Sequence, residues 1–213
     1  MSFSVWVSLL AATVVISLTP GAGAINTMSN SMSVGWRRSG WGVLGQQLAL
    51  IVHIGVVAAG VGVLVAQSPV LFNAIRYAGA AYLVYLGIRL IIARPDAPAA
   101  PRPDGDEADA PPTESAWSLA RRGFWVNILN PKAIVFFLAF LPQFIRVDQP
   151  AIPQYLVLIV TVVAVDLVVM WGFFAVAARP FRRYSESRRG QRVLNSTFGS
   201  LFVAVAGLLV FVH

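Results

Sequence analysis

The chain has 213 residues, of which 57% are hydrophobic and 12% charged, with a formal net charge of +7 and no cysteine. Soluble domains carry roughly 25% charged residues, so this composition excludes a water-soluble protein and predicts a membrane protein. The basic residues lie in short gaps between apolar runs, which argues against nucleic acid as a partner, and the absence of cysteine excludes disulfides and thiolate chemistry.

Six apolar runs are long enough to cross a bilayer, which takes about 20 helical residues. In chain order they cover residues 3–33, 42–66, 70–92, 120–142, 154–178 and 194–213. Thr19-Pro20-Gly21 interrupts the first run, and Asn130-Pro131 interrupts the fourth at the corresponding place. Thr and Asn are favoured helix N-caps and proline is favoured at the first helical position, so both breaks predict helices that start inside the membrane. The predicted fold class is all-α, a polytopic membrane protein of six transmembrane helices with helices one and four broken.

Residues 94–119 are predicted to form a disordered cytoplasmic linker, because the segment is rich in proline and acidic residues and poor in large apolar side chains. The linker divides the chain into two three-helix repeats, residues 1–93 and 120–213. Three spans is an odd number, so the second repeat would enter the membrane from the opposite side, as an inverted repeat. The two breaks, and glycine pairs eight residues apart in spans three and six, support this reading. Incidental helix kinks are the alternative.

The distribution of arginine predicts the orientation, because short cytoplasmic loops retain Lys and Arg. If six spans alternate, one side of the membrane receives only Arg76 and Arg146. The other side receives Arg37, Arg38, Arg94, Arg102, Arg121, Arg122, Arg179, Arg182, Arg183, Arg188, Arg189 and Arg192. Both termini are therefore predicted to lie outside the cytoplasm.

Ionisable residues at membrane depth are costly, so each one is a functional candidate. Asp166, in the middle of span five, cannot reach the interface, so it is expected to face the bundle interior and to exchange protons. His53, in the middle of span two, is the second candidate for proton coupling, although a hydrogen bond between helices would also explain it. Lys132 follows the second break, where it would reach a substrate carboxylate, pair with Asp166, or lie in a water-filled vestibule.

A helix that starts inside the bilayer leaves unpaired N–H groups and the positive end of a dipole at depth. In inverted spans the two starts point toward each other near the midplane, which suits a carboxylate. Side chains or water could satisfy the same groups instead. The predicted substrate-binding residues are Thr19, Pro20, Gly21, Asn26, Gln47, Asn130, Pro131 and Lys132. No catalytic residue, metal site or cofactor is predicted.

Several stretches resemble the lysine exporter (LysE) superfamily, specifically its homoserine and threonine exporter (RhtB) branch. They include SLTPGAGAINTM at 17–28, IVHIGVVAAGVG at 51–62, GAAYLVYLGI at 79–88, FWVNILNPKAIVFF at 124–137, LPQFI at 141–145, VDLVVMWG at 165–172 and FGSLF at 198–202. The order and spacing of these stretches match over nearly the whole chain, and the resemblance adds Asn127 to the expected substrate-binding residues. One departure is Ala22, where much of the superfamily has a second proline.

The resemblance implies a proton-coupled exporter, an antiporter, of small amino acids or derivatives such as homoserine, homoserine lactone or threonine. It also implies a multi-pass protein of the bacterial inner membrane, so the termini that the arginines place outside the cytoplasm would be periplasmic. The expected partners are a small amino-acid substrate, protons and the lipid bilayer, and the glycine-rich spans would permit a homodimer.

Two other classes remain as alternatives. An intramembrane enzyme would use Asp166 and His53 as acid and base, but the sequence has no zinc-binding His-Glu-x-x-His helix and no Gly-x-Ser-x-Gly elbow, so no enzyme is predicted. A cation or metal carrier on the same scaffold would use Asp166 as a ligand, but a dedicated divalent site usually needs more than one carboxylate.

Overall fold

The computed structural model describes residues 1–93, 114–146, 148–180 and 187–211, and this part of the chain contains helices and no strand. In chain order the elements are α1 (Phe3–Leu18), α2 (Ala22–Val34), α3 (Trp36–Gln67), α4 (Pro69–Ile92), α5 (Ala116–Ile128), α6 (Pro131–Phe140), the 3-10 helix η1 (Leu141–Phe144), α7 (Ala151–Leu167), the π-helix η2 (Val168–Phe174) and α9 (Arg188–Phe211). The expected all-α class is confirmed for these residues. The predicted linker lies mostly outside them, and α5 begins within its predicted range, at Ala116.

Three helices are long and apolar enough to cross a membrane: Trp36–Gly60, Asn73–Ile92 and Ala151–Phe174. Two further spans are helix pairs bent at a break, α1 with α2 by 57° and α5 with α6 and η1 by 56°. The described residues therefore hold up to five candidate spans, as expected for a polytopic membrane protein. The helix α9 covers most of the predicted sixth span but is not among these candidates, so the six-span inverted repeat stays a prediction.

The two breaks differ in their local chemistry. Asn130 is the N-cap of α6, its side chain accepts the N–H of Lys132 at 3.1 Å, and Pro131 takes the first turn, as predicted. The corresponding prediction for Thr19 is wrong: Thr19 is the C-cap of α1, and its hydroxyl donates to the Val15 carbonyl. The N-cap of α2 is Gly21, which has no side chain to supply the cap.

Glycines set the closest helix crossings. Where α3 crosses α5, a Cβ placed on Gly45 or Gly123 would overlap the backbone of the other helix. Where α4 runs along α9, Gly87 and Gly199 meet, and a Cβ on Gly87 would lie 2.7 Å from the Gly199 carbonyl oxygen. Any larger residue would force these helices apart, so the crossings depend on the missing side chains.

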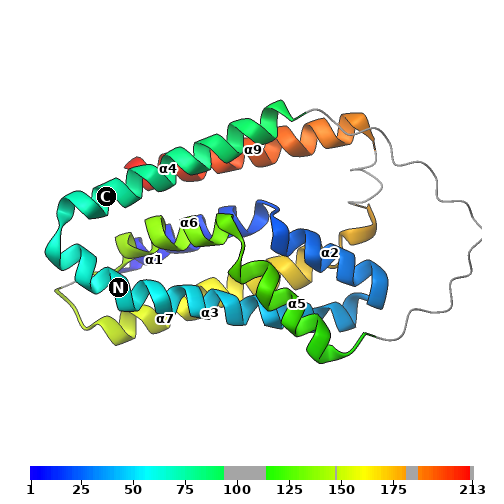
Figure 1. The fold of residues 1–213 in the computed structure, drawn as a ribbon, viewed down its shortest axis with the longest axis horizontal. Coiled ribbons are helices and arrows are strands. Elements are labelled where there is room, and N and C mark those ends of the chain that lie inside the picture. Colours follow the sequence, from blue (N-terminus) through cyan, green and yellow to red (C-terminus); the bar gives the residue numbers. More distant parts are fainter. Residues whose placement is uncertain (94–113, 147, 181–186, 212–213) are drawn as a thin grey trace, which may run out of the picture.

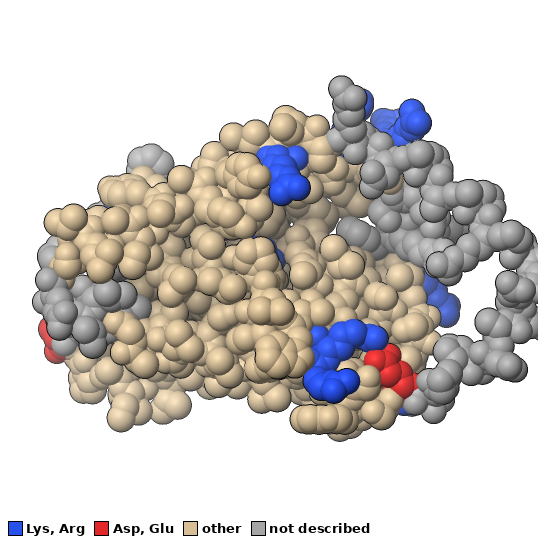
Figure 2. All heavy atoms as spheres, in the orientation of Figure 1, with Lys and Arg blue, Asp and Glu red and all other residues tan. Residues whose placement is uncertain are grey.

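The helix pair formed by α4 and α9 packs on α6 and α1, and α3 is the central helix, with α2, α5 and α7 against it (Figure 1). The helix α1 begins and α9 ends at one end of the molecule, whereas α4 ends and α5 begins at the other (Figure 1). Most of the Lys and Arg side chains visible on the face in Figure 2 lie in the half where α5 begins.

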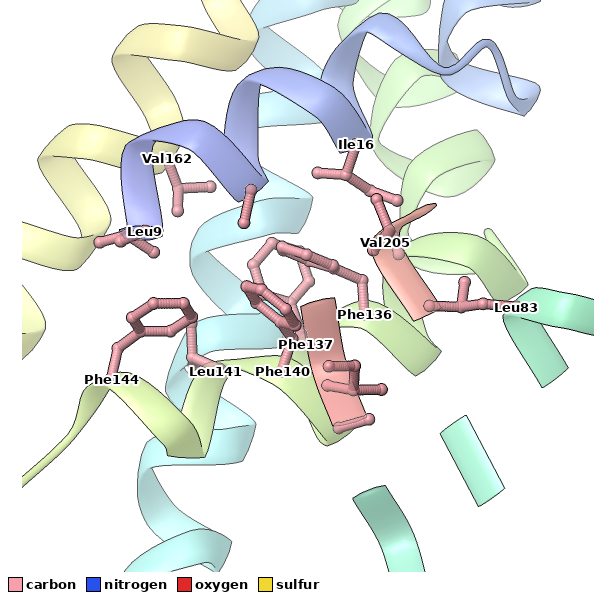
Figure 3. Close-up of a cluster of buried hydrophobic side chains, with 14 of the residues drawn as sticks. Leu9, Ile16, Leu83, Phe136, Phe137, Phe140, Leu141, Phe144, Val162 and Val205 are labelled. Carbon is pink, nitrogen blue, oxygen red and sulfur yellow. The ribbon is translucent and has the colours of Figure 1, made fainter. Parts of the chain in front are cut away.

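The largest apolar core lies between α1, α6 and their neighbours. It is built around buried rings of α6 and η1, with Phe136 and Phe140 stacked at 4.9 Å and Phe140 and Phe144 also 4.9 Å apart (Figure 3). These rings follow directly after the second break, so the segment that starts at Asn130 carries both polar and aromatic groups into the protein interior.

Candidate functional site

The two helix breaks meet around a narrow cavity of about 40 Å³. This space admits a few water molecules. Its polar lining comes from five elements and both breaks, and its apolar lining from α1, α2, α3, α6, α7 and η2. The lining residues are Thr13, Ile16, Ser17, Gly21, Gly23, Ala24, Gln46, Leu50, Asn127, Asn130, Lys132, Ala133, Phe136, Phe137, Val162, Asp166 and Met170.

Lys132 joins the second break to the first. Its ammonium group donates to the carbonyl oxygens of Ile16 at 2.9 Å and Thr19 at 2.6 Å. In a continuous helix the Ile16 carbonyl would accept the N–H of residue 20, but that residue is Pro20, which has no N–H. Lys132 therefore supplies a donor that the proline removes, and a cation at the carboxyl end of α1 also complements the helix dipole.

Asp166 is the buried anion of the cavity. One carboxylate oxygen accepts the Ser17 hydroxyl at 3.0 Å, and the other accepts the Gln47 side-chain amide at 2.8 Å. Ser17 lies on α1 and Gln47 on α3, so the carboxylate is oriented by two helices besides its own. A carboxylate has about four acceptor positions, so positions remain for a further donor.

Among the described residues, the ion pairs are Arg122 with Glu114 and Arg146 with Asp148, so no direct ion pair joins Lys132 to Asp166. Both face the same cavity, and each is held by neutral hydrogen-bonding groups. An ammonium group has three donors, and two of those of Lys132 are used. The site thus keeps one cationic donor and several anionic acceptors for a guest.

Amide side chains connect the second break to α3 and α2. Asn130 donates to the Asn127 side-chain oxygen at 3.4 Å, and Asn127 donates to the Gln46 backbone carbonyl at 3.1 Å. Gln46 in turn donates to the Gly23 carbonyl at 3.1 Å and to the Thr27 hydroxyl at 3.0 Å. The start of α2 and the end of α5 are therefore fixed relative to each other across the cavity.

Met170 lies in the π-helix η2, which begins just after Asp166. The N–H of Ala175 donates to the Met170 carbonyl, five residues back. In an α-helix it would donate to the Trp171 carbonyl, four residues back. The Trp171 carbonyl instead accepts the indole N–H of Trp36 at 3.1 Å. The indole N–H of Trp171 in turn donates to the Trp36 carbonyl at 3.2 Å. The two indoles are stacked 5.2 Å apart, so this pair ties η2 to the start of α3.

The structure brings several of the predicted site residues together and leaves others apart. Gly21, Asn127, Asn130, Lys132 and Asp166 line the cavity. Thr19 and Gln47 do not line it but bond residues that do. Pro20, Asn26 and Pro131 are not in the lining either: Pro20 and Pro131 shape the breaks, and Asn26 is buried on α2.

His53 also lies outside the lining, and its ring is stacked on that of Phe137 at 5.6 Å. Phe137 does line the cavity, so His53 contacts the site through an aromatic ring. The hydrogen-bond partners of Asp166 are Ser17 and Gln47, not His53.

The sequence analysis did not assign Thr13, Ser17 or Gln46 to the site, although all three line the cavity. Thr13, Ser17 and Gly21 recur every fourth residue, a helical spacing that leads into the first break and that would have signalled a polar stripe on one face. Within the described ranges, no group of three His, Cys, Asp or Glu side chains is close enough to hold a metal ion.

Comparison with known proteins agrees with the motifs. The model of the family described as "LysE type translocator" matches residues 14–212. The chain is 40% identical over 209 residues to a homoserine/homoserine lactone efflux protein of Salmonella typhi, covering 98% of this chain and 97% of that protein. It is 41% identical to an uncharacterized membrane protein of Vibrio cholerae, covering 98% of each chain. No solved structure matches the chain.

Proposed function

The chain belongs to the LysE type translocator family and is a transporter, not an enzyme, and from this premise we propose that it exports small amino acids from the cytoplasm. Homoserine and its lactone are the first candidates, because relatives that match 98% of the chain are homoserine/homoserine lactone efflux proteins. Threonine follows from the resemblance of the motifs to the homoserine and threonine exporter branch. We propose further that export is coupled to the entry of protons, as an antiport.

One observation carries the proposal: a cation with a free donor and an anion with free acceptors face one buried cavity without pairing. An amino acid such as homoserine is a zwitterion with the complementary groups, whereas its lactone has no carboxylate and would use the ammonium group alone. The homoserine carboxylate would accept the third donor of Lys132 and the free N–H groups at the start of α2, beside Gly21. The ammonium group would donate to Asp166.

Proton coupling would arise because the substrate and the proton share one acceptor, the Asp166 carboxylate. Asp166 would bind either the substrate ammonium group or a proton, but not both. Release of the substrate outside the cytoplasm would therefore accompany uptake of a proton there, and release of the proton into the cytoplasm would accompany uptake of the next substrate. His53 keeps the predicted role of a second proton carrier, acting behind Phe137 and not in direct contact with the substrate.

The cavity must widen to admit a substrate, because small-molecule sites are commonly several hundred Å³ and this one is about 40 Å³. The two breaks are the natural hinges, since the half-helices on either side are not joined by continuous helical hydrogen bonding. In the proposed topology the six spans form two inverted repeats in the bacterial inner membrane, with the linker cytoplasmic and both termini periplasmic.

Counterflow in proteoliposomes tests the proposal. Vesicles are loaded with homoserine, threonine, leucine or lysine, and the entry of labelled amino acid is followed with and without an imposed pH gradient. We expect exchange of small neutral amino acids, accelerated by the gradient and insensitive to chelators. Absence of exchange with all four in folded protein would refute the proposal.

A matched pair of variants tests the site. Asp166→Asn should abolish the response to the pH gradient while the protein still inserts and folds. The same substitution at Asp148, which is exposed in a loop and paired with Arg146, should leave exchange unchanged. Full coupled transport by Asp166→Asn would remove Asp166 from the mechanism.

A further inference from the structure

We propose that Thr13 determines which substrate side chains the transporter accepts, favouring short side chains that end in a hydrogen-bond donor such as a hydroxyl. This inference rests on the proposed function, since it places the ammonium group of the substrate at Asp166. It goes further by assigning the side-chain end of the site to a residue of α1.

The position of Thr13 follows from the helix register. Thr13 is 1% exposed, lines the cavity, and lies four residues before Ser17, the residue that bonds Asp166. Residues four apart lie on the same face of a helix, and with a rise of 1.5 Å per residue the two are separated by about 6 Å along the axis. A substrate held by Asp166 beside Ser17 can therefore extend its side chain one helical turn to Thr13.

The substrate's orientation follows from the opposite end of the cavity. Lys132 bonds the carbonyls of Ile16 and Thr19, and its ammonium nitrogen would lie 3.6 Å from a Cβ placed on Gly21. The carboxylate is therefore expected on the Gly21 side of Ser17, and the side chain on the opposite side, toward Thr13. The carboxylate would thus lie at the first break, the ammonium group beside Ser17, and the side chain one turn further back on α1, at Thr13.

The hydrogen bonding of Thr13 makes it an acceptor. Its hydroxyl donates to the Leu9 carbonyl at 2.7 Å, which uses its only hydrogen, and its two lone pairs remain. A substrate hydroxyl can donate to this oxygen, whereas a methyl group cannot.

The remaining walls of this end are apolar. Phe136, Phe137 and Val162 line the cavity with Thr13, and Figure 3 shows the two rings facing the stretch of α1 between Leu9 and Ile16. A charged side chain would find no partner among these groups and would pay the cost of burial. The arrangement therefore suits a small neutral side chain with one terminal donor.

A purely structural role for Thr13 makes a different prediction. Threonine in transmembrane helices commonly bonds the carbonyl four residues back, as Thr13 does, and that bond alone serves only the helix. If this were the whole role of Thr13, its loss would affect every substrate equally. Selectivity between two substrates that differ at one group separates the two readings.

The experiment compares homoserine with norvaline, in which a methyl group replaces the terminal hydroxyl. Counterflow is measured for both with wild type, Thr13→Val and Thr13→Ser, and KM is separated from the maximal rate. We expect Thr13→Val to lower kcat/KM for homoserine about 10-fold to 100-fold, mainly through KM, because a bond of this kind discriminates by that factor. Norvaline exchange should be unchanged, and Thr13→Ser, which keeps the hydroxyl, should retain the wild-type preference.

Thr161→Val is the control. Thr161 is also buried and also donates to the carbonyl four residues back, at 2.7 Å, but it lies on α7 outside the cavity. Its hydroxyl also accepts the Trp6 indole N–H at 3.1 Å, so this variant removes a bond between α7 and α1 as well. It should leave the ratio of homoserine to norvaline exchange unchanged.

An unchanged ratio of homoserine to norvaline exchange in Thr13→Val, with or without an equal loss for both substrates, would overturn the inference while leaving the proposed function intact. Absence of amino-acid exchange in the wild type would instead refute the proposed function itself. The yield and unfolding midpoint of each purified variant show whether a loss of transport reflects a loss of folding.

Discussion

Replacing Lys132 by methionine should destabilise the protein, because Lys132 holds the two broken helices together. Methionine keeps the unbranched apolar stem but removes the ammonium group, and with it the bonds to the Ile16 and Thr19 carbonyls. The Ile16 carbonyl has no helical donor to return to, because Pro20 lacks an N–H.

The magnitude follows from the two lost bonds. A hydrogen bond to a charged group contributes about 1.5–3 kcal/mol in soluble proteins. In membrane proteins interhelical bonds average about 0.6 kcal/mol and reach about 1.7 kcal/mol. Since the Ile16 carbonyl is left without a helical donor, we use the upper membrane value for each bond and expect Lys132→Met to cost about 3 kcal/mol.

Denaturant unfolding in detergent, followed by tryptophan fluorescence, measures this cost. Arg146→Met removes a cation from an exposed loop and should change the free energy of unfolding by less than about 0.5 kcal/mol. A loss below about 1 kcal/mol for Lys132→Met, less than one bond at the upper membrane value, would refute the structural role.

A double variant tests whether the two buried charges act together. If Lys132 and Asp166 stabilise each other across the cavity, the costs of Lys132→Met and Asp166→Asn should not add, with a coupling of about 0.5–3 kcal/mol. Strict additivity would show that each charge is stabilised by its own hydrogen bonds alone.

Two further predictions concern the fold. A methyl group at Gly45 would overlap the Ala120 carbonyl, so Gly45→Ala should cost about 1–3 kcal/mol of stability. Gly55→Ala, where nothing lies within 4 Å, should change stability by less than about 1 kcal/mol, and equal unfolding of both variants would contradict the close crossing of α3 and α5. Because the chain has no cysteine, single cysteines introduced just before α1 and just before α5 can be labelled with a membrane-impermeant thiol reagent. They should react from opposite sides of the membrane, and labelling from one side would contradict the six-span topology.

The sequence predicted the second break more accurately than the first. Asn130 and Pro131 act as cap and first residue of α6, because an amide side chain before a proline satisfies a helix start by local chemistry. Thr19 is also a favoured N-cap residue that precedes a proline, but its hydroxyl caps the end of α1, and α2 begins after Gly21. Which end of a break a hydroxyl serves depends on where the next helix is packed, and this cannot be read from the residues alone.

In the candidate site, too, the sequence identified some of the residues but not their neighbours. Asp166 and Lys132 were identified from the sequence, because a charge inside an apolar span is costly wherever the span is packed. His53 was identified by the same argument, yet its ring is stacked behind Phe137. The periodicity of a helix indicates which residues share a face, but not which neighbour that face meets.

The sequence by itself determined the membrane character of the chain, its apolar runs, the places where two of them break and the ionisable groups at depth. These are local properties, set by the hydropathy of consecutive residues and by the missing N–H of proline. Only the tertiary structure decided that Ser17 and Gln47 hold Asp166, that Lys132 closes α1, and that Thr13 faces the same cavity. The physical reason is separation: Ser17 and Asp166 are 149 residues apart, and such contacts arise only when helices from both halves pack together.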